Sequence, residues 1–168
     1  GPFSLAIGLL LISYTSWTSA YLHILPFRRW SIVLIYLVLL LIVWGCRSNR
    51  EAVREAILER DFLTPALLFA SLFVLTLAAW TYVRGLMPKA EGLEKFMDYG
   101  FMMSMWRSDY LPAKDIWLAG QPINYYYYGQ FVYTMLSKFM NIMPMYSYNL
   151  GMASTMAYVV VLAAALGW

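Results

Sequence analysis

The sequence predicts an all-α, polytopic transmembrane protein with about five spans in its 168 residues. Hydrophobic side chains make up 62% of the chain and charged side chains only 12%, whereas soluble domains are about 25% charged. The mean hydropathy is +0.61. Crossing about 30 Å of hydrocarbon takes about 20 helical residues, and several apolar runs approach that length. Helices are expected because backbone polar groups in lipid must be satisfied within their own segment.

The predicted spans are the apolar runs of the chain, in order Phe3–Leu22, Trp30–Gly45, Phe62–Val83, Ile123–Met143 and Leu150–Trp168. The second run is short, but Trp30 and Trp44 bracket it and suit the two membrane interfaces. Pro65 falls in the first turn of the third run, where a helix tolerates a missing N–H. We expect residues 1–168 to form a single transmembrane domain that is the N-terminal part of a longer chain.

The segment Arg47–Arg60 predicts a short amphipathic helix on the membrane surface, between the second and third spans. It carries four arginines, and the positive-inside rule therefore places it in the cytoplasm. The loop at residues 84–122 is then extracytoplasmic, in a multi-pass protein of the plasma membrane. Arg28 and Arg29, between the first two spans, argue weakly against this orientation.

Charge and composition also restrict the partners. The net charge is only +3 and no basic run indicates nucleic acid, so the lipid bilayer is the expected partner. His23 and Cys46 are the only histidine and cysteine, which excludes a His/Cys zinc cluster and an intrachain disulfide. A divalent cation would have to be held by carboxylates, which suits Mg²⁺ or Mn²⁺.

The candidate chemistry lies in the long polar interruption Glu94–Gly129. The spacing of apolar residues over Gly92–Trp106 predicts an interfacial helix at its start. On that helix Glu94 and Asp98, four residues apart, would share one face. Two close carboxylates raise the pKa of one of them, which suits a general base, or they hold a divalent cation. The alternative is a solvated helix face that Lys95 partly neutralises.

The cationic side chains of the same loop are suited to binding a phosphate group. Arg107 and Lys114 are expected to meet a phosphate at headgroup level, since arginine binds phosphate bidentately and lysine acts as a point charge. The alternative is that such side chains only anchor the loop at the interface. Lys138 lies within the predicted fourth span, near its cytoplasmic end, where snorkelling toward the headgroups would explain it.

Four successive tyrosines follow an asparagine, and side chains of these types are suited to binding a sugar. On a helix these rings would point about 100° apart, so some must face the protein or the loop. Their hydroxyls would then hydrogen-bond a sugar or order the acidic residues. An aromatic belt combined with packing is the alternative for each ring. The residues concerned are Asn124, Tyr125, Tyr126, Tyr127 and Tyr128.

Taken together, these elements resemble the signature of the YYY membrane proteins, large polytopic proteins of archaea and some bacteria. The matching pieces are Glu94–Asp98, Arg107-Ser108, Asp115–Gly120 and Asn124–Gly129. The chain departs from the family at Ile116, where a proline is usual. The YYY family is regarded as related to the GT-C glycosyltransferases. The resemblance therefore implies a GT-C-like fold, with an extracytoplasmic loop that carries interfacial helices.

The resemblance also implies an enzyme: a membrane glycosyltransferase that moves a sugar from a polyprenyl-phosphate-linked donor to an extracytoplasmic acceptor. Asp98 would deprotonate the acceptor or bind a metal ion, with Glu94 as its partner in either role. Arg107 and Lys114 would stabilise the phosphate leaving group. The rest of the substrate site would comprise Asp115, Trp117, Asn124, Tyr125, Tyr126, Tyr127 and Tyr128.

Two other functions stay open from the sequence. A non-catalytic structural or accessory subunit of a larger membrane complex would use the same loop to dock a partner. Its acids would then form ion pairs with Lys95, Arg107 or Lys114. A transporter is less favoured, because its site is expected near mid-bilayer among broken helices and no acid lies in a predicted span.

Overall fold

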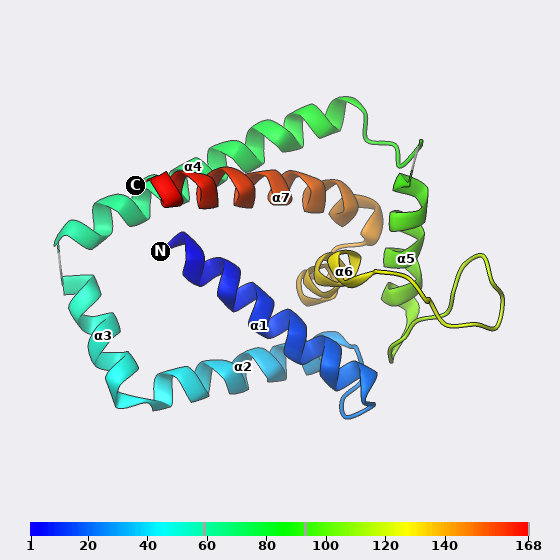
Figure 1. Ribbon diagram of the computed structural model, residues 1–168, viewed down its shortest axis with the longest axis horizontal. Coiled ribbons are helices and arrows are strands. Elements are labelled where there is room, and N and C mark those ends of the chain that lie inside the picture. The colour runs from blue at the N-terminus through cyan, green and yellow to red at the C-terminus, as the bar shows by residue number, and fades with distance from the viewer. Residues whose placement is uncertain (59, 93, 168) are drawn as a thin grey trace.

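The computed structural model describes residues 1–58, 60–92 and 94–167, and its regular elements there are all helices. They are α1 (Pro2–Tyr21), α2 (Arg29–Gly45), α3 (Arg47–Leu58), α4 (Arg60–Leu86), α5 (Lys95–Arg107), α6 (Tyr128–Met140) and α7 (Pro144–Gly167). In Figure 1, α1, α2, α4 and α7 run lengthwise, while α3 and α5 lie across opposite ends and α6 is viewed end-on beside α5. The all-α prediction is confirmed for the described chain.

Three described helices are long and apolar enough to cross a membrane, namely α1, the Leu63–Leu86 part of α4, and α7. Helix α2 has only 17 residues, and it qualifies as a span only jointly with the start of α3, from which it is bent by 82°. The described residues therefore contain three or four candidate spans instead of the predicted five.

The predicted fourth span, Ile123–Met143, was wrong, because only α6 (Tyr128–Met140) is helical there. Its 13 residues cover about 20 Å, which is too short to cross a bilayer. The helix stops at Asn141, whose left-handed backbone (φ 58°) lets its N–H reach the carbonyls of Ser137 and Lys138. Ser137 and Lys138 are themselves buried, so the polar face of α6 packs against protein.

The neighbouring elements also shift slightly from their predicted bounds. Helix α7 begins at Pro144, a residue suited to the first helical position, and so adds six residues to the predicted fifth span. The last residue of that span, Trp168, lies outside the described residues. The predicted interfacial helix is α5, from Lys95 to Arg107, and Leu93 of the predicted range lies outside the described residues as well. The amphipathic helix predicted over Arg47–Arg60 corresponds to α3, which ends at Leu58, whereas Arg60 begins α4 and Glu59 lies outside the described residues.

The buried core gathers at the α5 end of the bundle. Side chains from α1, α5, α6 and the intervening loops form one cluster, which includes Ala20, Phe27, Phe101, Met105 and Phe131. At the other side of the bundle α4 packs along α7, with Phe73 and Tyr158 in edge-to-face contact at 5.1 Å between ring centroids. The long loop before α6 is thus fastened to the best-packed part of the molecule.

Helices α6 and α7 approach closely at Gly151, and this contact yields a prediction. A Cβ at Gly151 would stand 2.9 Å from Cγ of the Tyr133 ring, so Gly151→Ala should lower the free energy of unfolding by about 1 kcal/mol through overpacking. Thermal unfolding in detergent would measure the change. Gly8→Ala is the matched control, because nothing lies within 4 Å of a Cβ there and alanine favours a helix. Equal stability of both variants would contradict the contact.

Candidate functional site

Asp98 is the best-placed acid of the loop. It lies in the first turn of α5, where the helix dipole favours a carboxylate, and it is half-buried. Its Oδ1 accepts a 2.7 Å hydrogen bond from Nε2 of Gln130, in the first turn of α6. Glu94 is the N-cap residue of α5 and is exposed. The two predicted acids therefore stand one helical turn apart, and the structure adds Gln130 as a partner of Asp98.

Tyr125 and Tyr126 form an exposed aromatic pair near these acids. Their rings stack at 4.0 Å between centroids, and the Tyr125 hydroxyl donates a 2.7 Å hydrogen bond to that of Tyr126. This hydrogen bond, followed by desolvation, raises the pKa of Tyr125 to about 12, and the charges of Tyr126, Glu94 and Asp98 add smaller contributions in the same direction.

The other two tyrosines face the protein interior. Tyr127 belongs to the buried core, and burial raises its pKa. The Tyr128 hydroxyl lies 3.0 Å from Oγ of Ser13, and its ring meets Trp17 edge-on. The sequence interpretation placed all four tyrosines on one helix, but α6 begins only at Tyr128. The preceding backbone is irregular, and this separates the exposed rings of Tyr125 and Tyr126 from the buried Tyr127 and the partly buried Tyr128.

Asp115 shapes the loop. Its Oδ1 accepts hydrogen bonds from the backbone N–H groups of Leu118 (2.9 Å) and Trp117 (2.7 Å), which hold the pKa of Asp115 below its ordinary value. Trp117 packs edge-on against Phe96 and Phe101 of α5. Both residues were predicted to bind substrate, and in this structure they fix the conformation of the loop.

A hollow of about 640 Å³ lies beside this loop. Its wall combines apolar rings with hydroxyl, amide and carboxylate groups, contributed by Tyr21, Asp115, Gln121, Asn124, Tyr125 and Tyr127. Four of the predicted site residues therefore meet here. Asp98 and Glu94 do not line this hollow, and Tyr125 is the lining residue whose pKa their charges help to raise.

The two predicted phosphate-binding cations stand apart from the acids. Arg107 occupies the last turn of α5, and nine residues of helix separate it from Asp98 by about 13 Å. Arg107 and Lys114 are exposed, and neither side chain has a hydrogen bond or ion pair among the described residues. They are free to bind an anion, but the structure does not place Arg107 beside Asp98.

Lys138 has a role that the sequence interpretation missed. Its ammonium donates hydrogen bonds to the carbonyls of Phe27 and Ser108, the latter at 2.8 Å, and lies 4.1 Å above the centre of the Phe27 ring. The prediction that Lys138 snorkels was wrong, since the side chain is only 9% exposed. The available signal was the spacing of Gln130, Thr134 and Lys138, which places polar groups on one face of α6.

The remaining acids are less suited to catalysis or metal binding. Asp109 forms a bidentate pair with Arg28 at 2.8 and 2.6 Å, which ties the α1–α2 turn to the end of α5. This contact lowers the pKa of the Asp109 carboxyl. Within the described ranges no three His, Cys, Asp or Glu side chains gather into a potential metal site. The pair Glu94 and Asp98 is therefore the candidate for a cation that keeps most of its water ligands.

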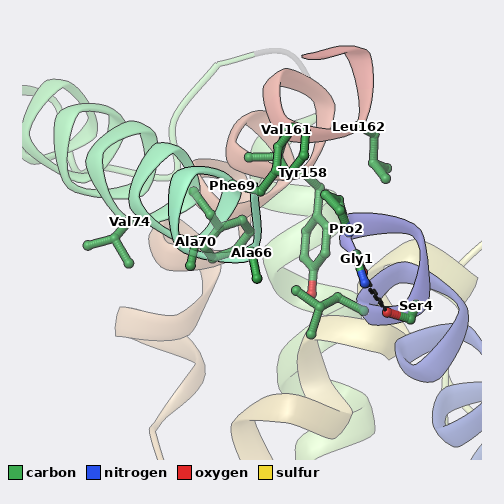
Figure 2. Close-up of a pocket in the computed structure, with 12 residues that line it drawn as sticks. Gly1, Pro2, Ser4, Ala66, Phe69, Ala70, Val74, Tyr158, Val161 and Leu162 are labelled. Atoms are coloured by element: carbon green, nitrogen blue, oxygen red, sulfur yellow. Dashed lines mark hydrogen bonds between the residues drawn. The ribbon is translucent and has the colours of Figure 1, made fainter. Parts of the chain in front are cut away.

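Figure 2 shows a different hollow, of about 340 Å³, formed by the start of α1 with α4 and α7. Its walls are mostly apolar and include the side chains of Val74, Val161 and Leu162. The amino group of Gly1 bonds Oγ of Ser4 at 3.1 Å, the dashed line in Figure 2. Its lining contains no carboxylate, so it is not the candidate catalytic site.

Comparison with known families agrees with the membrane assignment. A family model described as "Uncharacterized membrane protein (DUF2298)" matches residues 11–168. The chain belongs to the DUF2298 family. No curated protein and no solved structure matches it. In this DUF2298 protein the matched range includes most of α1, the whole loop and the candidate site.

The tyrosine pair of this DUF2298 protein gives a prediction about ionisation. Tyr126→Phe removes the acceptor of the Tyr125 hydroxyl, so the pKa of Tyr125 should fall from about 12 toward 10. Tyrosinate would then form at lower pH. NMR titration of protein labelled at the tyrosine Cζ would measure the change. Tyr82→Phe on α4, an exposed position, should leave Tyr125 unchanged, and an unaltered Tyr125 pKa in Tyr126→Phe would refute the hydrogen bond.

Proposed function

We propose that this DUF2298 protein is a membrane glycosyltransferase of the GT-C type. It transfers a sugar from a polyprenyl-phosphate donor to an acceptor hydroxyl outside the cytoplasm of the cell. The observation that carries the proposal is the position of Asp98. This half-buried carboxylate is oriented by a 2.7 Å hydrogen bond from Gln130, and its charge contributes to the raised pKa of Tyr125, which lines a hollow of about 640 Å³.

In the proposed reaction Asp98 removes the proton from the acceptor hydroxyl. The resulting oxygen attacks the anomeric carbon of the donor sugar, and the bond between that carbon and the phosphate oxygen breaks. The attack comes from the face opposite the phosphate, and polyprenyl phosphate leaves with the electron pair, so this single displacement inverts the configuration of the sugar. Arg107 and Lys114 are unpaired cations that would hold the phosphate, which would then extend along α5 away from Asp98.

The arrangement of helices supports this proposal. Helices α5 and α6 lie between α4 and α7 in the chain and cross the end of that packed pair (Figure 1). The YYY resemblance implies the same succession, in which a loop with interfacial helices follows one span and precedes the next, as in a GT-C-type protein. The arginines of α3, at the opposite end of the molecule in Figure 1, favour a cytoplasmic location for that end and an extracytoplasmic location for the loop. We propose this orientation for a protein of the plasma membrane.

The carboxylate pair also fits a divalent cation. Glu94 has no hydrogen bond to its side chain among the described residues, and Asp98 uses only Oδ1, so oxygens of both acids are available. Mg²⁺ and Mn²⁺ accept such ligands and keep several waters. When bound, the cation would supply charge stabilisation to the departing phosphate. EDTA followed by Mg²⁺ would test this part of the proposal.

The alternative function is an accessory subunit of a larger membrane complex. It is favoured by the loop tip, where Ile116, Trp117 and Leu118 are 46–62% exposed and offer an apolar contact to a partner. In that case the Asp98 hydrogen bond only stabilises the loop. Purification under mild conditions would show a stoichiometric partner that a Trp117→Ser variant releases.

The decisive experiment is transfer of radiolabelled sugar from a panel of polyprenyl-phosphate donors by the full-length protein in liposomes. Transfer, or hydrolysis of the donor, that depends on Asp98 supports the enzyme. Protein that is folded, correctly inserted and inactive with every donor would overturn the proposal in favour of the subunit.

A further inference from the structure

The hollow of about 640 Å³ beside the loop is separate from the acid pair and is large enough for a ligand of its own. Small-molecule sites in proteins measure roughly 300–1,000 Å³. The lining comes from the end of α1 and from the loop between α5 and α6. That loop projects beyond α5, away from α4 and α7 (Figure 1). We call this cavity the loop hollow.

The charge of the loop hollow is unfavourable for an anion. Asp115 lines it, and the described lining residues include no Arg, Lys or His. Backbone hydrogen bonds hold the pKa of Asp115 below its ordinary value, so its carboxyl group is ionised at neutral pH. Arg107 and Lys114 do not line the cavity. A phosphate group would therefore meet a like charge with no cation to offset it. The phosphate-bearing donor is thus disfavoured here, which leaves the loop hollow for the second substrate.

Three side chains of the loop hollow have unused hydrogen-bonding capacity. The amides of Gln121 and Asn124 are exposed and have no hydrogen-bond partner among the described residues. Asp115 uses only Oδ1, which accepts from two backbone N–H groups. An amide both donates and accepts, and the free Oδ2 of Asp115 accepts. A ligand rich in hydroxyl groups would satisfy all three side chains.

Two tyrosines contribute aromatic surface to the same cavity. Tyr21, from the end of α1, is 45% exposed, and Tyr125, from the loop, is 42% exposed. The Tyr21 ring stacks on Trp17 at 5.0 Å, and the Tyr125 ring stacks on Tyr126 at 4.0 Å, so neighbouring rings hold both in place. Such rings combine an apolar face with a polar hydroxyl. They suit a ligand that has apolar C–H faces and a rim of hydroxyl groups, as a sugar ring has.

We propose that the loop hollow binds a neutral oligosaccharide, and that this oligosaccharide is the acceptor of the transferred sugar. Its role as acceptor rests on the proposed glycosyltransferase function, whereas its binding does not. One sugar ring lies against Tyr21 and Tyr125, and its hydroxyls bond the two amides and Asp115. Because Asp98 does not line the cavity, the reacting hydroxyl belongs to a further sugar that extends past Tyr125 toward α5. The Tyr125 ring is 6.1 Å from that of Phe101 on α5.

The first test measures binding to the unaltered full-length protein by saturation-transfer difference NMR. The probes are neutral disaccharides and trisaccharides of glucose, galactose, mannose and N-acetylglucosamine. Phosphatidylcholine nanodiscs are used, because the headgroups of maltoside detergents would compete. Saturation of the C–H protons of at least one probe is expected, with about tenfold weaker binding of the corresponding monosaccharide, which makes fewer contacts. A phosphorylated form of the bound probe should also bind about tenfold more weakly, because of its charge.

The outcomes separate this proposal from the proposed enzyme. If no probe binds, the saccharide proposal is overturned, and sugar transfer to a protein or lipid acceptor would leave the enzyme intact. If a probe binds but receives no sugar from any polyprenyl-phosphate donor that the protein uses, its role as acceptor is overturned. Equal binding of the neutral and phosphorylated probes would refute the commitment to a neutral ligand.

The second test places the ligand in the loop hollow. Gln121→Ala combined with Asn124→Ala should weaken binding about tenfold, because two hydrogen bonds to the ligand are lost and none within the protein. Tyr21→Leu keeps an apolar side chain without the ring and should weaken binding about fivefold. Tyr82→Leu on α4, where the tyrosine is 71% exposed, is the matched control and should change nothing.

Equal affinity of the amide variant, Tyr21→Leu and Tyr82→Leu would place the saccharide elsewhere and overturn the proposal. If Tyr21→Leu does not fold, the amide variant still decides the question, since neither amide has a hydrogen bond within the described residues.

Discussion

Asp98→Asn should lower the rate of sugar transfer about a thousandfold, within the range that general-base catalysis supplies. Asparagine has the same shape as aspartate, and its Oδ1 can still accept the hydrogen bond from Gln130 that the structure shows at 2.7 Å. The half-buried side chain should therefore keep its position and lose only its ability to take a proton. The measurement is kcat with the most active donor in liposomes, together with the unfolding temperature of each variant.

Asp109 provides a matched control for Asp98. It pairs with Arg28, so it is not free to act as a base. Asp109→Asn should leave kcat within about threefold of the unaltered protein, because exposed ion pairs contribute little to stability. Full activity in Asp98→Asn would refute the assignment of the base. An equal loss in both variants, with lowered unfolding temperatures, would show damage to the loop instead of chemistry.

Lys138→Met should lower the free energy of unfolding by about 3 kcal/mol, as expected when buried acceptors lose a charged donor. Methionine matches the length of the lysine stem and fills the same space. The carbonyls of Phe27 and Ser108 would then lose their shared donor, and the contact of the ammonium with the Phe27 ring would disappear. Because these groups belong to the α1–α2 turn and to the end of α5, the variant should loosen the whole loop.

Thermal unfolding in detergent and limited proteolysis near Ser108 would measure this effect. Lys95→Met is the control, since Lys95 has no hydrogen bond or ion pair from its side chain among the described residues. Lys138→Arg should restore part of the stability, because a guanidinium keeps the charge and the donors. An unfolding temperature of Lys138→Met equal to that of Lys95→Met would contradict the structural role of Lys138.

Local patterns in the sequence were sufficient for most of the helices. Long apolar runs predict α1, α4 and α7 because each such helix satisfies its own backbone in lipid. The segregation of charged and apolar side chains predicts α3 in the same way. The resemblance and the spacing of polar residues also directed attention to Asp98 and to the loop that contains Tyr125, before any contact was known.

The predictions from sequence failed where a helix buried in protein and a helix in lipid require the same kinds of side chain. Helix α6 and a membrane span both need apolar side chains, and only the position of Asn141 as a left-handed cap shows where α6 ends. Similarly, a lysine in an apolar run suggests snorkelling, yet two carbonyls from distant loops surround Lys138.

By itself, then, the sequence determined the all-helical membrane class and the loop that carries the polar groups, because hydropathy and local spacing act over a few turns of one segment. Only the tertiary structure decided which groups of that loop are partners. It joined Asp98 to Gln130, separated Arg107 from Asp98 along α5, and divided the tyrosines into an exposed pair and two that pack against the core. Contacts between residues far apart in the chain depend on how the helices pack, and no local pattern encodes that packing.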